Sequence, residues 1–517
     1  MRANAIVVAA GILLSRLAGL IRQRVFAHYF GIQSDAADAF SAAFRIPNFL
    51  QNLFGEGALS ASFIPVYASL VSRDERREAT DVAGAIAAVL ALVTSVLVVL
   101  GVLATPLLIA LIAPGFDGSK RDLTITLVRI LFPGAGLLVM SAWCLGILNS
   151  HHRFLLSYSA PVLWNAAMIT TLVAFGGVAS LPTLAVYLAW GSVVGSAIQF
   201  LVQLPVVLRL VPGLRLTFAS GSQHVRTVLR NFVPVFISRG VVQISAYIDA
   251  LLASLLPTGA VAGLANAQLI YTLPVSLFGM SVSAAELPAM SGAAGVDNQR
   301  LKDRLNAGLR QIAFFVVPSA VAFLALGDIV AGALLQTGRF TRADSVYVWG
   351  ILAGSAIGLL ASTLGRLYSS TFYALRDTAT PLRYAIVRVA LTTVLGYLCA
   401  VRLPPFIGVD LKWGTAGLTA SAGVAGWIEF VMLRATINSR LGGTGIPASM
   451  LLRLWTSAFA AAAVGWGTKL LVGVASPIIS AVAVLGAYGV VYLGLTMVMG
   501  VPEARGALSR VMRRRRG

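Results

Sequence analysis

Residues 82–113 read VAGAIAAVLALVTSVLVVLGVLATPLLIALIA and contain no charged side chain. A hydrocarbon core about 30 Å thick is crossed by a helix of about 20 apolar residues, so this stretch is long enough to span a bilayer. Runs of similar length recur along nearly the whole chain, which is 58% hydrophobic and only 11% charged. Soluble domains carry about 25% charged residues. The sequence therefore predicts an all-α polytopic membrane protein.

The apolar runs predict about fourteen transmembrane helices, each about 20 residues or longer. They cover residues 4–27, 38–71, 82–113, 123–149, 156–177, 182–208, 231–256, 261–291, 311–336, 345–373, 384–401, 413–433, 454–473 and 477–500. Most basic residues between these spans lie on the side of the N-terminus, and a minority, including Lys120 and Lys469, lie on the other side. Cytoplasmic loops carry the excess of Lys and Arg, which predicts that both termini are cytoplasmic.

The net charge of +20 fits this topology better than it fits nucleic-acid binding. The basic tail 501–517 is interpreted as a cytoplasmic topology and lipid-surface signal. Tryptophans near span ends, including Trp143 and Trp164, are expected in the interfacial belts.

Two parts of the chain show a similar pattern about 220 residues apart, as in transporters built from parallel repeats. The first has Ser15-Arg16, Pro47 and Pro65, and the second has Ser238-Arg239, Pro274 and Pro288. The pattern predicts a six-helix N-terminal lobe (1–208), a six-helix C-terminal lobe (209–440), two further helices (441–500) and the tail 501–517. A central cavity is expected between the lobes. The prolines are interpreted either as packing kinks or as hinges.

Ionisable residues are concentrated in the first two predicted spans: Arg16, Arg22, Arg24, Arg45 and Glu56. A charge at the bilayer centre costs roughly 3 kcal/mol or more, so such residues usually face an internal aqueous cavity. Because four of the five are arginines, the cavity is expected to receive an anion, and the guanidinium fork suits phosphate oxygens. Arg239 and Arg366 are further cationic candidates, and Asp249 is a candidate for binding Na⁺ or H⁺.

Other classes of protein fit less well. No catalytic triad, phosphate-binding loop or paired loop carboxylates are found, and His151-His152 lacks the further ligands of a metal site. A membrane glycosyltransferase would need a large acidic extracytoplasmic loop, and a drug or cation antiporter would need an acidic cavity. We therefore predict a transporter with no catalytic residues and no bound metal or cofactor.

Two long segments carry a family resemblance: SRLAGLIRQRVFAHYFG (15–31) and DAFSAAFRIPNFLQNLFGEGALSASFIPV (38–66). Three more are GILNSHHRFLLSYSAPVLWNAAMI (146–169), LQTGRF (335–340), and Phe-Tyr-Ala with Asp-Thr and Thr-Pro within 372–381. In these motifs the chain closely resembles the MurJ (MviN) lipid II flippases of the MOP exporter superfamily.

The resemblance implies a flippase in the bacterial cytoplasmic membrane that supports peptidoglycan synthesis, cell wall biogenesis and cell shape. Its cargo would be lipid II, the undecaprenyl-pyrophosphate-linked peptidoglycan precursor, carried to the outer leaflet by alternating access. The substrate-binding residues that it implies are Arg16, Arg22, Asp38, Arg45 and Glu56. Arg22 and Glu56 are further hypothesised to pair as a gate. The implied partners are lipid II and membrane lipids, and the protein is expected to act as a monomer.

Three positions depart from the family pattern. Gln23 replaces a common acid, Gln51 replaces an arginine, and Gln268 or Leu269 stands where an eighth-helix arginine is usual. A flippase for another polyprenyl-linked oligosaccharide therefore stays open as an alternative. Transport is expected to be coupled to the membrane potential or to a monovalent cation, because an electric field acts directly on an anionic cargo.

Overall fold

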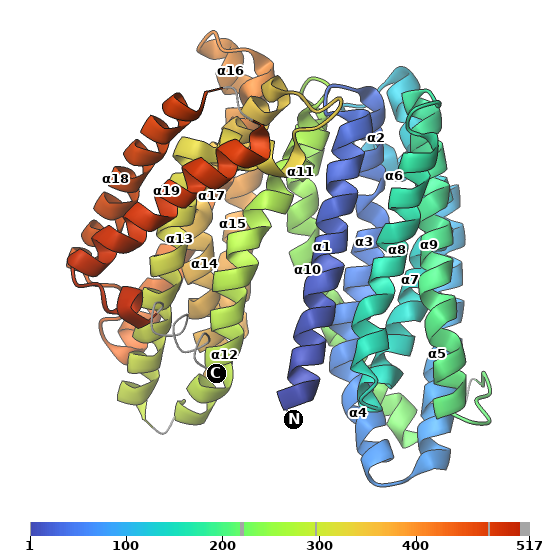
Figure 1. Ribbon diagram of the computed structural model, residues 1–517. Coiled ribbons are helices and arrows are strands. Elements are labelled where there is room, and N and C mark those ends of the chain that lie inside the picture. The colour runs from blue at the N-terminus through green and yellow to red at the C-terminus, as the bar shows by residue number, and fades with distance from the viewer. Residues whose placement is uncertain (1, 218–221, 295–296, 474–475, 507–517) are drawn as a thin grey trace. The chain divides into compact units, whose positions relative to one another are not determined.

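The computed structural model describes residues 2–217, 222–294, 297–473 and 476–506. Within these ranges, the side chains of residues 2–9, 47, 55–58, 60–61 and 233–246 lie outside the description. The described chain is built from helices joined by short connections, and it forms no β-strand in these ranges. The all-α class predicted from the sequence is confirmed (Figure 1).

Contacts divide the chain into two compact units. Unit 1 comprises Met1–Ala262 together with Thr337–Phe340, and unit 2 comprises Gly263–Gln336 together with Thr341–Gly517. The predicted lobes 1–208 and 209–440 and the added pair of helices at 441–500 stay predictions.

Unit 1 begins with a long helix, which packs along α8 (Phe154–Phe175), and continues with a second span that is broken into several short pieces. Its elements are α1 (Arg2–Phe30), α2 (Asp35–Ala43), α3 (Arg45–Leu50), the π-helix η1 (Gln51–Leu59), α4 (Ser60–Ser72), α5 (Arg76–Leu103), α6 (Thr105–Ile112), α7 (Gly118–Ser150), α8 (Phe154–Phe175), α9 (Leu181–Leu210) and α10 (Gln223–Ser254).

Unit 2 contains the longest described helix and ends in a hairpin of two helices, α18 (Ala448–Val472) and α19 (Pro477–Val498), that pack side by side (Figure 1). After α11 (Ala260–Pro274), which crosses the division, come the π-helix η2 (Val275–Met280), α12 (Ser281–Ala293), α13 (Asn298–Leu335), α14 (Arg342–Ala374), α15 (Ala379–Tyr397), the π-helix η3 (Leu398–Arg402), α16 (Leu403–Phe406), the 3-10 helix η4 (Leu411–Trp413), α17 (Gly414–Leu441), α18 (Ala448–Val472) and α19 (Pro477–Val498).

Within the described residues, 11 helices are long and apolar enough to cross a membrane. Each of these helices overlaps one predicted span. Together they account for every predicted span from residue 82 onward except the span at 231–256. That span and the spans at 4–27 and 38–71 contain residues whose side chains lie outside the description. The total of fourteen spans therefore stays a prediction.

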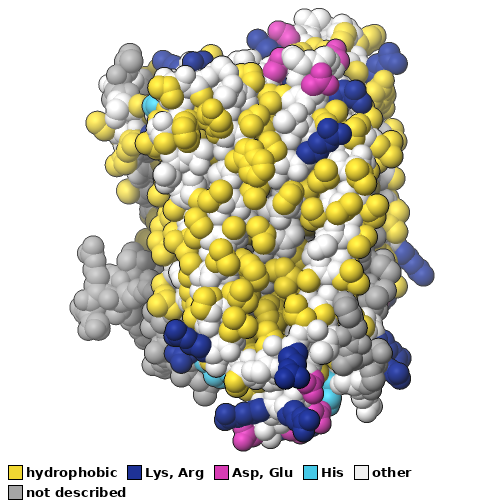
Figure 2. Space-filling model, turned by 90° about the vertical axis from the view of Figure 1, so that its right-hand side faces the viewer, with side chains coloured by type: hydrophobic (Ala, Val, Ile, Leu, Met, Phe, Trp, Pro, Cys, Tyr) yellow, Lys and Arg dark blue, Asp and Glu magenta, His cyan; other side chains and the backbone are white. Residues whose placement is uncertain are grey.

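The outer surface has the polarity expected of a protein in lipid. Leucines and valines are exposed along the helices, for example Leu103 at 71% and Leu107 at 71%. Figure 2 shows one face on which hydrophobic side chains cover the middle and most charged side chains lie toward the two ends. Apolar exposure of this extent would be costly in water, so hydrocarbon is the medium that this surface fits.

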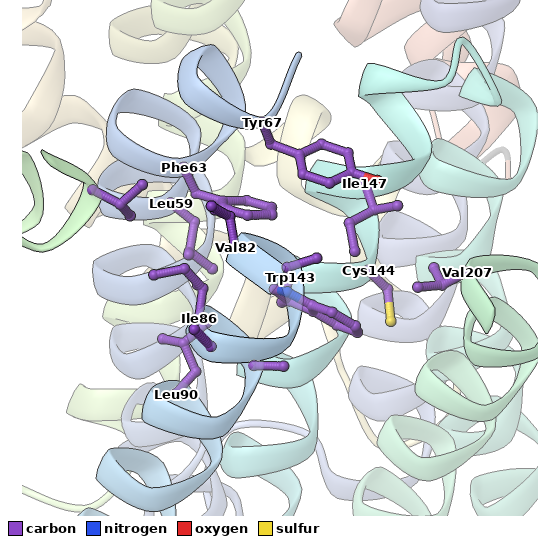
Figure 3. Packing of buried hydrophobic residues seen from close by; sticks show 14 of the residues in the cluster. Leu59, Phe63, Tyr67, Val82, Ile86, Leu90, Trp143, Cys144, Ile147 and Val207 are labelled. Atoms are coloured by element: carbon purple, nitrogen blue, oxygen red, sulfur yellow. The ribbon is translucent and has the colours of Figure 1, made fainter. Parts of the chain in front are cut away.

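The interior of unit 1 is closely packed where α4, α5 and α7 meet. Phe63 and Tyr67 of α4 pack with Ile86 of α5 and with Trp143 and Cys144 of α7 (Figure 3). Trp143 is 1% exposed, so its expected place in an interfacial belt was wrong. This burial could not be predicted from the sequence, because a tryptophan near a span end fits either environment.

Each of the two similar sequence patterns contains a π-helical segment between its prolines. η1 lies between Pro47 and Pro65, and η2 lies between Pro274 and Pro288. A π-helix shifts the backbone hydrogen-bond register, and such segments occur frequently at functional sites. The repeat seen in the sequence therefore extends to the backbone, while the choice between packing kinks and hinges stays open.

Candidate functional site

Arg22 of α1 lies against a stacked pair of aromatic rings. Its guanidinium carbon is 4.8 Å from the ring centroid of Phe44 and 5.6 Å from that of Trp164, and the two rings stack with centroids 5.5 Å apart. Its Nη1 also contacts the sulfur of Met168 at 3.8 Å. A cation over desolvated rings gains about 2 kcal/mol, which supports the charge without neutralising it.

The aromatic platform under Arg22 is itself fixed. The indole Nε1 of Trp164 donates to the carbonyl and hydroxyl oxygens of Ser192 in α9, both at 3.1 Å. Trp164 is 7% exposed, so it was wrongly expected in an interfacial belt. Among the side chains that the structure describes, no carboxylate forms an ion pair with Arg22. The result is a rigidly supported cation within the helices of unit 1.

Arg16 lies about two turns earlier on α1 and lines a polar cavity of about 440 Å³ within unit 1. α1, η1, α7, α8 and α9 enclose it. Besides Arg16, its polar lining consists of Ser15, Gln51, Ser141, Asn149, Ser157, Tyr158 and Gln199. Arg16 and Gln51, which were separated in the sequence argument, therefore share one cavity.

One wall of this cavity offers buried hydrogen-bonding atoms. Ser141 Oγ accepts from the Nε2 atoms of Gln199 and Gln203 at 2.9 and 3.1 Å. The Oε1 atom of Gln199, the Oγ atom of Ser157 and the Oδ1 atom of Asn149 are buried without a protein partner among the described atoms. Buried polar groups left unpaired cost about 1–3 kcal/mol each, so this wall is suited to water or to a hydroxyl- or amide-bearing ligand.

Arg45 lies at the start of α3 and faces α10. Its carbonyl oxygen accepts a hydrogen bond from the Tyr247 hydroxyl at 2.9 Å, and its guanidinium interacts electrostatically with Asp249. Tyr247 also packs edge-on against Phe49 with ring centroids 5.4 Å apart. The structure thus brings together Arg45 and Asp249, two residues that were separate candidates in the sequence.

Asp38 is held by three partners and is only 1% exposed. Its Oδ2 atom lies 2.7 Å from Lys120 Nζ and accepts from the Gly259 N–H at 2.9 Å, and its Oδ1 atom accepts from the Ala262 N–H at 2.8 Å. In this arrangement the carboxylate links α2, α7 and the first turn of α11. The binding role implied for Asp38 stays a prediction.

The remaining candidates are Arg24, Arg366, Glu56 and Arg239. Arg24 is half-buried on α1. Arg366 of unit 2 is exposed and interacts electrostatically with Glu429, which also pairs with Arg388 at 3.4 Å. The side chains of Glu56 and Arg239 lie outside the described residues, so the Arg22–Glu56 gate stays a hypothesis.

A turn carried by one of the family-like motifs closes against α1. His28 Nδ1 lies 2.8 Å from the Thr337 hydroxyl, and the Arg339 N–H donates to the His28 carbonyl at 2.8 Å. Gly338 has φ +53°, and a Cβ there would lie 2.4 Å from the His28 oxygen. The motif therefore fixes the end of α1 and requires glycine at this position.

Lys120, Trp164 and Tyr247 are the supporting residues that the sequence argument missed. Lys120 was expected on the extracytoplasmic face, and no pattern in the sequence indicated its contact with Asp38. For metals, one group within the described residues, Glu75, Glu78 and His224, could share an ion. It lies outside the predicted spans, and exposed acidic groups of this kind are common without a metal.

Comparison with known proteins identifies related sequences. A family model described as lipid II flippase MurJ matches residues 26–490. The chain is 33% identical over 435 residues to the lipid II flippase MurJ of Burkholderia cenocepacia, covering 83% of this chain and 82% of the relative. It is 34% identical over 448 residues to a probable lipid II flippase MurJ of Rhizobium tropici, with coverage of 84% and 80%.

Solved structures support the same fold. The structure described as lipid II flippase MurJ in an inward closed conformation matches with a TM-score of 0.78 at 24% identity, covering 96% of this chain and 98% of that one. An inward-facing MATE multidrug resistance transporter of the MOP superfamily matches with a TM-score of 0.67 at 18% identity, with coverage of 84% and 98%. At these identities the likeness concerns the fold alone.

Proposed function

Because this chain belongs to the MurJ family of lipid II flippases, we propose that it moves lipid II from the inner to the outer leaflet of the bacterial cytoplasmic membrane. The cargo consists of a polyprenyl tail, a pyrophosphate and a peptidoglycan precursor headgroup. The tail is compatible with hydrocarbon, whereas the pyrophosphate carries about two negative charges and needs a cationic, hydrated path.

Arg22 is the observation that carries this proposal. It places a permanent positive charge inside the helices, on a fixed aromatic platform and without a carboxylate partner among the described side chains. Holding such a charge is costly unless an anion arrives to compensate for it. Arginine presents several donors in a fork that fits phosphate oxygens, so pyrophosphate is the group that Arg22 suits best.

The polar cavity at Arg16 supports the same cargo. It combines a second arginine with oxygen acceptors of Gln199 and Asn149 that have no protein partner among the described atoms. Sugars and peptides supply the hydroxyl and amide donors that these acceptors require. The alternative of another polyprenyl-linked oligosaccharide is not favoured, since the named relatives are lipid II flippases.

The remaining features of the transport cycle are inferred from the sequence. The cytoplasmic placement of both termini follows from the charge asymmetry of the loops. The membrane potential, positive outside, drives an anion outward with about 2.3 kcal/mol per charge per 100 mV, and a monovalent cation at Asp249 is the alternative coupling device. The cycle changes no covalent bond of the cargo, and one chain suffices for it.

Complementation of a lipid II flippase depletion strain tests the proposal, with lipid II in the outer leaflet as the readout. We expect the wild-type chain to restore growth and outer-leaflet lipid II. Arg22→Ala should abolish both, because it leaves the pyrophosphate without its cation. Arg22→Lys should restore activity only partly, since a point charge replaces the guanidinium fork.

Arg129→Ala is the matched control, because Arg129 is an exposed arginine on α7 of the same unit. It should complement like the wild type at equal expression. Failure of the well-folded wild type to move lipid II would refute the proposal. Equal losses in Arg22→Ala and Arg129→Ala would refute the role of Arg22.

A further inference from the structure

A second polar cavity of about 330 Å³ lies wholly in unit 2, apart from the residues of the proposed transport site. Its lining comes from α13, α14, α18 and α19, near the end of α13 and α18 and near the start of α14 and α19. The charged and polar residues of this lining are Asp328, Gln336, Arg342, Ser345, Lys469 and Ser480. Because four spanning helices begin or end here, the cavity lies at the level of the lipid headgroups.

Lys469 is fixed in place on one side of the cavity. Its Nζ atom lies 2.7 Å from Asp328 Oδ2, and it sits 4.4 Å and 5.8 Å from the ring centroids of Trp466 and Trp349. The side chains of Lys469 and Asp328 are 17% and 11% exposed. An ordinary surface lysine is mobile, whereas this one is held by a carboxylate and two indoles.

The two indoles are anchored by a kink in α13. Leu326 has φ −130° and ψ 17°, outside the helical range. Nearby carbonyls accept hydrogen bonds instead from indole donors: Leu324 from Trp349 Nε1 at 3.0 Å and Ala325 from Trp466 Nε1 at 2.9 Å. The kink therefore couples α13 to α14 and α18 and builds the wall that positions Lys469.

The charges of the cavity define the ligand that fits it. Arg342, exposed in the first turn of α14, adds a second cation to Lys469, and Asp328 is the one acid among the lining residues. Asp328 Oδ1 is buried without a partner among the described atoms. The site therefore suits a group with one negative charge that also presents a hydrogen-bond donor. A metal cation is disfavoured, because Lys469 and Arg342 both repel it.

We propose that this cavity binds the headgroup of a membrane phospholipid. The phosphodiester pairs with Arg342 and Lys469, and the terminal ammonium or hydroxyl group of the headgroup donates to Asp328 Oδ1. The adjacent hairpin exposes Leu470 at 75%, Leu471 at 89% and Ile479 at 61%, which gives the acyl chains an apolar surface. Phosphatidylethanolamine and phosphatidylglycerol meet both requirements, whereas phosphatidylcholine has no headgroup donor.

Native mass spectrometry of the delipidated full-length protein tests this site, using the three phospholipids with identical acyl chains. Because phosphatidylcholine cannot make the charge-assisted hydrogen bond to Asp328, phosphatidylethanolamine and phosphatidylglycerol should bind at least about tenfold more tightly than phosphatidylcholine. Arg342→Gln should weaken binding of all three lipids by about tenfold, because it removes one phosphate partner. Its melting temperature should match that of the wild type, since Arg342 is exposed.

Arg402→Gln is the control, because Arg402 is another exposed arginine of unit 2. It should bind the lipids like the wild type. Equal binding of phosphatidylcholine would overturn the assignment of a donor to Asp328, and equal effects of the two arginine substitutions would overturn the site. If soluble glycerophosphoethanolamine binds the protein as tightly as the intact lipid does, the ligand is a soluble phosphodiester and the lipid assignment fails.

Discussion

The ammonium nitrogen of Lys120 lies 2.7 Å from Asp38 Oδ2, and the side chains of this pair are 11% and 1% exposed. Asp35 lies on the same side of Lys120, at 3.5 Å, and its carboxylate also accepts from Thr258 at 2.8 Å. The Asp38–Lys120 pair connects the second predicted span to the start of α7, and Asp38 continues the connection to the first turn of α11. Because this pair is buried, the packing of the helices that it connects depends on the opposite charges of Asp38 and Lys120.

Lys120→Met should destabilise the protein by about 3–5 kcal/mol, because it leaves the Asp38 carboxylate buried without its cation. Thermal unfolding of the purified protein measures this effect. The double variant Lys120→Met, Asp38→Asn should regain part of the loss, since the isolated charge is then removed. Wild-type stability of Lys120→Met combined with loss of lipid II transport would contradict this structural role and favour direct contact of Asp38 with cargo.

Asp249→Asn should lower stability by about 1–3 kcal/mol, because it removes the negative charge that interacts electrostatically with the Arg45 guanidinium. Adding Arg45→Gln should cost less in the Asp249→Asn background than in the wild type. A double-mutant cycle of thermal unfolding measures the coupling, which should exceed about 0.5 kcal/mol for interacting groups. Strictly additive losses would show that the two residues act independently.

Gly338→Ala should destabilise the turn that closes against His28, for two reasons. The backbone of Gly338 has φ +53°, which costs an alanine about 1–2 kcal/mol, and the added Cβ would lie 2.4 Å from the His28 carbonyl oxygen. The variant Gly408→Ala separates the two effects, because Gly408 has φ +72° and no atom lies within 4 Å of a Cβ added there. Thermal unfolding should show a larger loss for Gly338→Ala than for Gly408→Ala, and equal losses would exclude the steric contribution.

The fold class and most spans could be predicted from the sequence, because a run such as 82–113 reports its environment through length and polarity alone. The arginines inside the helices could be found for the same reason. Their partners could not be predicted. Tyr247 and Lys120 reach Arg45 and Asp38 across about 200 and 80 residues of sequence, respectively, and helix periodicity contains no information about contacts between distant helices.

The tryptophans illustrate the same limit. Trp164 was expected at the interface because tryptophan is enriched there, yet its ring lies buried beside Arg22. Its indole finds a partner in Ser192, which removes the cost of burying the N–H group. A single sequence cannot distinguish the membrane interface from the protein interior. Each of these environments accommodates the apolar ring and offers a hydrogen-bond partner to the indole N–H group.

The stability of unit 2 is expected to fall at low pH because of Asp377. Its carboxylate accepts from the Thr380 N–H at 3.0 Å, from the Thr380 hydroxyl at 2.7 Å and from Arg440 at 2.8 Å. The Thr380 hydrogen bonds, together with Arg440, lower the pKa of Asp377 to about 2. An unfolded Asp has a pKa of about 3.9, so the stabilising contribution is complete above about pH 4 and is lost as the pH falls through about 2.

Asp377→Asn should therefore be less stable than the wild type at pH 7, by about 1 kcal/mol, the usual value of a hydrogen bond that caps the start of a helix. The difference should stay constant down to about pH 4 and vanish toward pH 2, because protonation then removes the same charge from the wild type. Thermal unfolding of the two proteins side by side at several pH values measures it. Hydrogen exchange in the first turn of α15 should report the same change locally. A difference that persists unchanged at pH 2 would show that the geometry of the side chain, and not its charge, holds this connection between α15 and Arg440 of α17.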